Sequence, residues 1–177
     1  QGVSSAASDV YKRQAYDKES MGASTERHNA RYDLTRDAQD QVAALSHQHA
    51  AAAQAAGVFD DEIVPVAVPQ RRGEPVLVTA DEGIRPDTTV ESLAGLRAAF
   101  ADGGSITAGN SSQISDGASA VVVTTRGTAE AKGWPVLVTV GASGQTAGPD
   151  NSLQAQPARA IERACEKQGI APADLDV

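Results

Sequence analysis

The chain has 177 residues, and its 15 Lys and Arg against 23 Asp and Glu give a formal net charge of −8. This acidic balance, with no basic cluster longer than Arg71-Arg72, argues against a nucleic-acid-binding surface or a basic membrane patch. No apolar run reaches the roughly 18 residues of a membrane span, and no secretory leader is recognisable. We therefore expect a cytoplasmic protein with neither nucleic acid nor membrane as a partner.

The apolar residues predict a thin hydrophobic core. Hydrophobic residues make up 41% of the chain, but 33 residues are Ala, and Leu, Ile, Val and Phe together also contribute only 33. The single Cys excludes a disulfide within one chain and any metal site built from several thiolates.

Residues 1–14 differ from the rest of the chain because they are small and polar and show no apolar periodicity. We interpret them as a non-native leader, with a disordered native terminus as the alternative. The chain opens on Gln1 and stops in an apparent strand at Val177, which indicates an internal part of a longer protein.

A long helix is predicted over residues 35–56, with Thr35 as N-cap and Gly57 as the C-terminal stop. Small and apolar side chains recur along it at spacings of three and four, which predicts one buried stripe. The stripe consists of Ala38, Val42, Leu45, His49, Ala52 and Ala56.

Two short strands, 63–68 and 76–78, flank a turn and predict a hairpin. Pro65 and Pro75 lack the N–H that a central strand requires, so the hairpin is expected at an edge or in a small separate sheet. A second helix is predicted over 89–100.

The C-terminal part alternates between strand-like and helix-like segments, which indicates a layered α/β unit after an α+β region. Residues 103–117 are rich in Gly, Ser and Asn, a composition that lets a ligand lie against backbone N–H groups and hydroxyls. The predicted elements that follow are a strand at 118–123 covered on both faces, a helix at 128–132, a strand at 136–140 and a helix at 152–168.

No metal site or nucleophile emerges from the pattern. His47 and His49 lie two residues apart on a helix, about 200° around the axis, so they cannot share one ion. Cys165 lies in mid-helix between Glu162 and Glu166, which disfavour a thiolate, so we expect an inert thiol.

The sequence of residues 107–118, TAGNSSQISDGA, closely resembles a signature of the thiolases. Further stretches match that family in the same order, and the resemblance covers about residues 15–177. These stretches are Met21-Gly22, Ser46-His47-Gln48, residues 59–65, residues 85–89 and the positions Leu93, Leu96, Arg97 and Phe100.

Thiolases are acyl-CoA C-acyltransferases with two βαβαβ halves and a loop domain inserted in the first half. The resemblance implies a thiolase-like layered α/β fold in which residues 15–114 are the CoA-binding loop domain. Residues 115–133 would then return into the N-terminal half, and residues 134–177 would open the C-terminal half. The implied reaction is thiolytic cleavage of a 3-ketoacyl-CoA, or the reverse condensation, in a homodimer or homotetramer.

The same resemblance assigns CoA contacts to five residues of this chain. Ser112 would hydrogen-bond the pantetheine arm and Ala108 would pack against it. Arg85 and Ser92 would meet the adenosine end, and Met21 would line the entry to the reacting thioester. CoA is a substrate in this reaction, and the resemblance implies no further cofactor and no metal.

The family's catalytic Cys, His and second Cys have no match in this chain, so we expect the polypeptide alone to be inactive. Two alternatives stay open. One is a stand-alone CoA-binding or scaffolding module without catalysis, and the other is a related condensing enzyme of the ketoacyl synthase kind.

Overall fold

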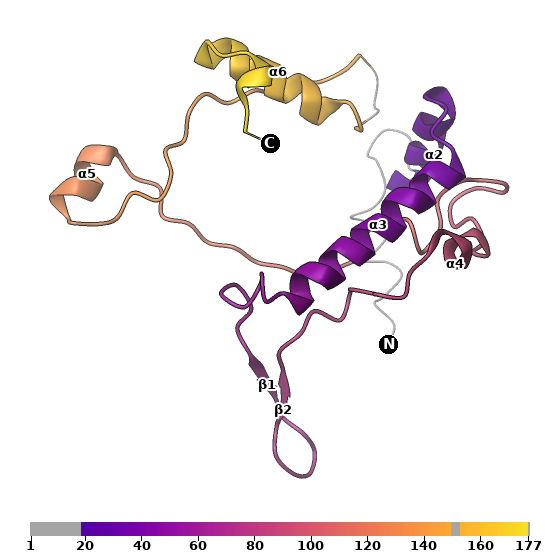
Figure 1. The fold of residues 1–177 in the computed structure, drawn as a ribbon. Helices are drawn as coiled ribbons and strands as arrows, with labels where there is room; N and C mark the ends of the chain where they lie inside the picture. The colour runs from indigo at the N-terminus through magenta and orange to yellow at the C-terminus, as the bar shows by residue number, and fades with distance from the viewer. Residues whose placement is uncertain (1–18, 150–152, 177) are drawn as a thin grey trace. The chain divides into compact units, whose positions relative to one another are not determined.

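The computed structural model describes residues 19–149 and 153–176, so the predicted 1–14 leader lies outside the described residues. The chain divides after Gln113 into two compact units. The first contains α2, α3, the β1–β2 hairpin and α4, and the second contains α5, α6 and a 3-10 turn, η1 (Figure 1). Within the described residues, no helix is both long and apolar enough to cross a membrane.

Helix α3 spans Arg36–Ala55 and confirms the predicted long helix. The Thr35 side chain accepts a hydrogen bond from the backbone N–H of Ala38 at 3.2 Å, as an N-cap should. Gly57 follows with a φ of +71°, the left-handed conformation in which glycine ends helices.

The predicted buried stripe of α3 is wrong. Val42 and Leu45 are 68% and 51% exposed and His49 is exposed as well, whereas Asp40 and Ala44 are buried. The reason is that the polar face finds hydrogen-bond partners on α4 and on residues 105–110, so α3 turns that face inward. The apolar stripe is left uncovered.

Helix α2, Met21–Arg31, was not predicted. Ser20 caps it by accepting from the backbone N–H of Ala23 at 3.2 Å. Its buried residues are Ser24 and Asn29, so its inward face is polar and gives no apolar period in the sequence. Glu26 ties α2 to the chain at Ser105 through hydrogen bonds described below.

The hairpin is confirmed, with shorter strands than predicted. Strands β1, Val66–Val68, and β2, Val76–Val78, pair antiparallel with Val66 opposite Val78. All six residues are exposed, as expected for a small separate sheet.

Helix α4 spans only Val90–Ala94, so the predicted helix over 89–100 is too long. Thr89 and Ser92 form a reciprocal capping box at its start. Beyond Gly95 the backbone becomes extended and doubles back, because Ala98 pairs with Thr107 and the N–H of Ala99 donates to Ile106 O at 2.8 Å.

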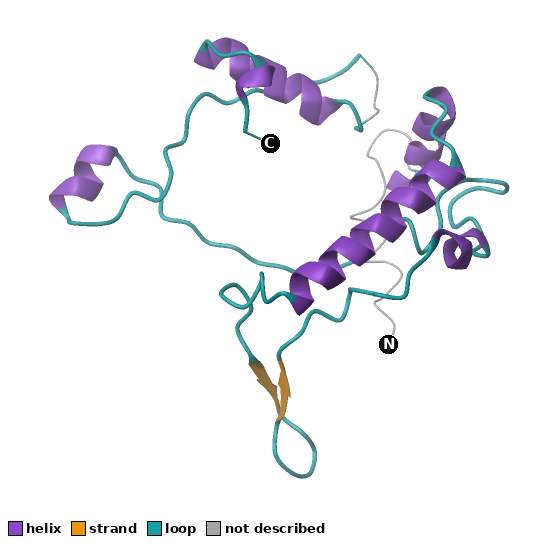
Figure 2. Ribbon diagram, viewed as in Figure 1, coloured by secondary structure: helices purple, strands orange, loops and turns teal. Residues whose placement is uncertain are grey.

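The second unit contains α5, Arg126–Ala131, α6, Gln156–Gln168, and η1, Pro172–Asp174. Both predicted helices exist, but the predicted strands at 118–123 and 136–140 are loops (Figure 2). Val122 and Leu137 are 85% and 88% exposed, so the expectation that 118–123 is covered on both faces is wrong too. A strand requires a neighbouring strand, and the described part of the chain provides none for either segment.

The core is thin, as the composition predicted. Its buried hydrophobic residues are Ala44, Leu93 and Ile106 in the first unit and Ala129 and Cys165 in the second. Polar contacts therefore carry much of the organisation in the first unit, where the candidate site lies.

Candidate functional site

A groove of about 920 Å³ lies in the first unit between one face of α3, the α4 segment and the loop at 108–113. The groove is lined by both apolar and polar side chains. The apolar ones are Leu34, Ala38, Val42, Ala43, Leu93, Leu96 and Ala108. The polar ones are Gln39, Ser46, His47, Arg85, Thr88, Ser92, Asn110, Ser111, Ser112 and Gln113, and Gly109 completes the lining.

The loop that carries Ala108 and Ser112 is fixed by its own side chains. Asn110 Oδ1 accepts from the backbone N–H of Thr107 at 2.7 Å, and Thr107 Oγ1 accepts from the N–H of Gly109 at 3.2 Å. The Ser111 hydroxyl donates to Thr107 O at 2.8 Å. Thr107 itself is fully buried, at 0% exposure, so the loop turns around an anchored residue. Ser112 is exposed on the groove side.

The α4 wall approaches this loop closely at Gly109. A Cβ placed there would lie 2.6 Å from Leu96 Cδ1 and closer still to the buried Leu93. Only glycine permits that approach without moving the leucines. On the same wall Ser92 is held by the capping box, in which its hydroxyl accepts from the Thr89 N–H at 3.0 Å, and the same hydroxyl also donates to Thr89 O at 2.8 Å.

The segment that carries Arg85 is tied to α3 through its backbone. The N–H of Arg85 donates to His47 Nδ1 at 3.2 Å, and Gln48 Nε2 donates to Thr88 O at 3.2 Å. Gln113 Nε2 donates to Gly83 O at 3.0 Å from the other side. The residue Arg85 is exposed, so this segment presents a cation at the groove.

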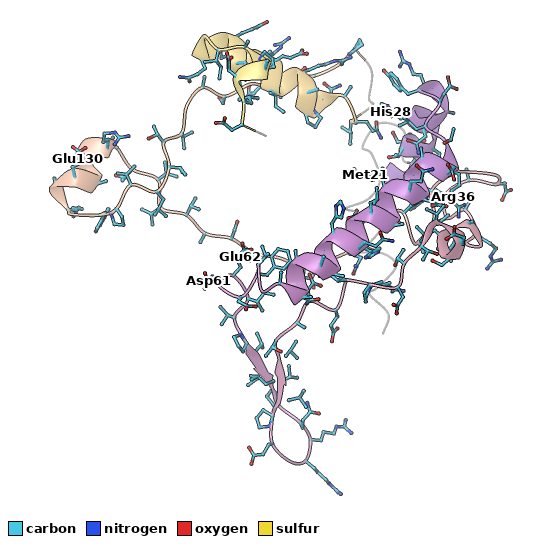
Figure 3. The ribbon with its side chains drawn as sticks, viewed as in Figure 1. Met21, His28, Arg36, Asp61, Glu62 and Glu130 are labelled. Carbon is cyan, nitrogen blue, oxygen red and sulfur yellow. The ribbon has the colours of Figure 1, made fainter. Side chains whose placement is uncertain are left out.

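Four of the five residues that the sequence assigned to CoA line this one groove: Arg85, Ser92, Ala108 and Ser112. Met21 does not belong to its lining. It begins α2 and is 49% exposed (Figure 3).

His49 was predicted to lie on the buried stripe of α3, but His47 is the more buried of the two histidines. His47 is half-buried, accepts a hydrogen bond and lines the groove, whereas His49 is exposed. Across residues 19–149 and 153–176, no group of three or more His, Cys, Asp or Glu could hold a metal ion. Cys165 is a free thiol buried in α6 of the second unit.

Two carboxylates behind the groove were missed by sequence reasoning. Asp40, at 1% exposure, pairs with Arg36 and with Asn110. Glu26 accepts from Ser105 N at 2.9 Å, from Ser105 Oγ at 2.9 Å and from Ile106 N at 2.7 Å. The only local signal was the spacing of four between Arg36 and Asp40, which is typical of an intrahelical ion pair.

Partial burial of the Glu26 carboxyl acts to raise its pKa. The three hydrogen bonds from Ser105 and Ile106 outweigh that effect and hold the pKa below its ordinary value. The Glu26 carboxylate is therefore a charged anchor between α2 and the start of the groove loop.

The groove suits an elongated ligand with mixed chemistry. Its apolar wall can cover methylene groups, its hydroxyls and side-chain amides can hydrogen-bond amides, and a guanidinium can bind phosphate or stack on a flat ring. Cys, the residue type that forms thioesters, is absent from the lining.

Comparison with known proteins gives one family. The family described as "Thiolase, N-terminal domain" matches residues 3–127, a match that begins within the segment 1–14. A probable acetyl-CoA acetyltransferase of Mycolicibacterium smegmatis is 55% identical over 157 residues, which are 89% of this chain and 40% of that protein. The peroxisomal 3-ketoacyl-CoA thiolase B of Rattus norvegicus is 44% identical over 161 residues, 89% of this chain and 38% of that protein.

Solved structures agree. The crystal structure of the Bacillus anthracis acetyl-CoA acetyltransferase matches with a TM-score of 0.85 and 35% identity, over 97% of this chain and 43% of that chain. Human mitochondrial 3-ketoacyl-CoA thiolase matches with a TM-score of 0.83 and 29% identity, over 97% and 43%. The predicted thiolase-like α/β fold is thereby confirmed, and the chain spans about 40% of the length of these relatives.

Proposed function

This chain belongs to the thiolase family, and from that premise we propose that it supplies the CoA-binding side of an acyl-CoA C-acyltransferase. The reaction is thiolytic cleavage of a 3-ketoacyl-CoA, or the reverse condensation of two acyl-CoA molecules. The substrates are acyl-CoA and CoA.

One observation carries the proposal. Arg85, Ser92, Ala108 and Ser112, which the family resemblance assigns to CoA, are spread over 28 positions of the chain and line a single groove. Its mixture of apolar wall, hydroxyls and one cation matches the parts of CoA, which are an amide-bearing arm and a phosphorylated nucleotide.

The residues take distinct roles in this proposal. The Ser112 hydroxyl hydrogen-bonds a pantetheine amide, and Ala108 packs against the arm. The Arg85 guanidinium meets adenine or phosphate, with Ser92 beside it. Met21, outside the groove lining, faces the thioester end.

None of these residues forms a covalent bond in the proposed reaction. Cys165 is 3% exposed and lies in α6, so we do not assign it the role of the thioester-forming Cys. What the chain contributes is uniform binding, which affects KM more than kcat.

The remaining parts of the proposal rest on family resemblance. Residues 15–114 form the loop domain, 115–133 belong to the N-terminal half and 134–177 to the C-terminal half. The whole protein is a cytoplasmic homodimer or homotetramer that acts in fatty acid metabolism. The rat relative is named as peroxisomal, so the cytoplasmic location is tested by localising the protein in its native cell.

Calorimetric titration of the 177-residue chain with CoA tests the proposal. We expect saturable binding that Ser112→Ala weakens by about two- to twelve-fold, because one neutral hydrogen bond contributes ~0.5 to 1.5 kcal/mol. Ser119→Ala, an exposed serine outside the groove lining, is the control and should leave the affinity unchanged. Absence of CoA binding by the unsubstituted chain would contradict the proposal.

A chimera separates the acyltransferase from the CoA-binding module without catalysis. Residues 15–177 replace the matching region of the M. smegmatis relative, and thiolysis of acetoacetyl-CoA is measured. Turnover in which Ser112→Ala raises KM at unchanged kcat supports the acyltransferase. A chimera that folds and binds CoA without turnover favours the module.

A further inference from the structure

Asp40 is a buried carboxylate on α3 with one partner on its own helix and one on the groove loop, although Asp40 itself is not part of the groove lining. It accepts from Arg36 Nε, one helical turn earlier, at 2.6 Å, and from Asn110 Nδ2 at 2.9 Å. Burial of a carboxylate is costly unless it is paired and hydrogen-bonded, and these contacts satisfy both conditions.

The contact with Asp40 determines which way the Asn110 side-chain amide points. An ionised carboxylate only accepts hydrogen bonds, so the NH₂ of Asn110 must face Asp40. The amide oxygen then points the other way, where it accepts from the backbone N–H of Thr107 at 2.7 Å. The same NH₂ also donates to Ser105 O at 3.0 Å. These hydrogen bonds fix the conformation of the turn that leads to Ser112.

Arg36 extends the same contacts to the other wall. Its guanidinium donates to Leu93 O at 2.5 Å and to Leu96 O at 3.2 Å, at the carboxyl end of α4. Leu93 and Leu96 line the groove, and Ser92 is adjacent in the chain. Arg36 is the first residue of α3 (Figure 3), and Asp40 follows one helical turn later.

We propose that Asp40 is a positioning residue for CoA, which, with Arg36 and Asn110, sets the separation of the Ser112 loop from α4. This inference rests on the proposed function for the identity of the ligand. Asp40 touches no ligand atom. It acts by orienting the Asn110 amide and by neutralising the guanidinium that holds α4.

Substituting Asp40→Asn tests the orientation directly. One carboxylate oxygen becomes an NH₂ group, which must face either Arg36 Nε or Asn110 Nδ2, and both of these are donors. We expect the CoA dissociation constant of the 177-residue chain to rise roughly tenfold, as for a lost charge-assisted hydrogen bond. Asp37→Asn is the matched control, because Asp37 is an exposed carboxylate on the same helix bonded to Gln41, and it should change the affinity less than about twofold.

Hydrogen exchange in the ligand-free chain provides a readout that does not depend on CoA. We expect Asp40→Asn to accelerate exchange at the Thr107 and Gly109 amides roughly tenfold and to leave the α3 amides unchanged. Acceleration spread evenly over the first unit would show only general destabilisation and would overturn the inference.

Exchanging the side chains of positions 40 and 110 tests whether the contact between them can be restored in the opposite sense. Asn110→Asp alone places two carboxylates, both acceptors, against each other and should weaken CoA binding and loosen the Thr107 amide. Combining it with Asp40→Asn restores a donor between the two positions and keeps an acceptor for Arg36 and for the Thr107 N–H. The double variant should recover part of the affinity and protection lost in Asn110→Asp, because the carboxylate at position 110 still cannot donate to Ser105 O.

A double variant no better than Asn110→Asp would overturn the inference, even if Asp40→Asn alone fails to fold. Failure of the unsubstituted chain to bind CoA would count against the proposed function instead. In that case exchange at the Thr107 amide still decides whether Asp40 orients the loop.

Discussion

Asp40 and Asn110 share a hydrogen bond of 2.9 Å although 70 positions separate them in the chain. The bond joins the buried face of α3 to the loop that carries Ser112, and Arg36 continues it to α4. Three distant segments thus meet through polar contacts in a unit whose buried hydrophobic residues, among residues 19–113, are only Ala44, Leu93 and Ile106. The shape of the groove depends on those contacts.

Gly109→Ala should lower both the stability of the first unit and its affinity for CoA, although it adds only one methyl group. The added methyl group would lie 2.6 Å from Leu96 Cδ1 and closer to Leu93, which is buried and cannot easily move away. Overpacking of this kind costs ~1 to 3 kcal/mol, so we expect a lower melting temperature and at least fivefold weaker CoA binding, about 1 kcal/mol. Calorimetric melting and titration measure the two effects.

Gly127→Ala is the control for that change. Gly127 lies in α5, and a Cβ there meets no atom within 4 Å. Because alanine favours a helix over glycine, this variant should be neutral or slightly more stable. Equal effects of the two substitutions would contradict the close approach of Gly109 to α4.

Glu26 should make the first unit sensitive to acid. Its pKa is depressed in the folded chain, since the hydrogen bonds from Ser105 and Ile106 outweigh its partial burial. The stability it contributes is therefore complete above its ordinary value of 4.5 and is lost as the pH falls through the lower folded value. Melting curves at successive pH values below 5 should show a steeper loss for the unsubstituted chain than for Glu26→Gln. Parallel curves would contradict this assignment.

The prediction for Cys165 is that it takes no part in chemistry. The thiol is 3% exposed within α6, so reagents and substrates have little access to it. We expect slow alkylation by iodoacetamide and no cleavage of acetoacetyl-CoA by the 177-residue chain. Turnover that Cys165→Ala abolishes would overturn this expectation.

The isolated chain should bind hydrophobic dyes. Val122 and Leu137 lie on the uncovered segments 118–123 and 136–140, and the stripe of α3 adds Val42 and Leu45. Uncovered apolar surface of this kind favours association and a weak thermal transition. A monomeric chain with a sharp melt above about 60 °C and no dye binding would show that these segments are covered, since typical domains melt between about 45 and 65 °C.

The sequence predicts those elements whose signals are local. Thr35 and Gly57 mark the ends of α3, and alternating Val residues mark the hairpin. The groove residues Arg85, Ser92, Ala108 and Ser112 come from resemblance, because nothing in their spacing indicates that they share a groove.

What the sequence does not predict depends on distant partners. Helix α2 and Asp40 turn polar faces inward, and the reason lies 70 to 80 positions away in Ser105, Ile106 and Asn110. Conversely, the apolar run 118–123 reads as a strand, but a strand also requires a neighbour with which to pair, and the described residues contain none for it.

Mapping CoA on the chain by amide chemical shifts tests the central claim most directly. CoA is titrated into the isotope-labelled 177-residue chain, and the backbone amides are followed by NMR. We predict saturable shifts at Ser92, Gly109 and Ser112, weaker ones at Arg85, and none in α5 or α6. Shifts confined to the second unit, or no shift at millimolar CoA, would contradict the assignment of the groove to CoA.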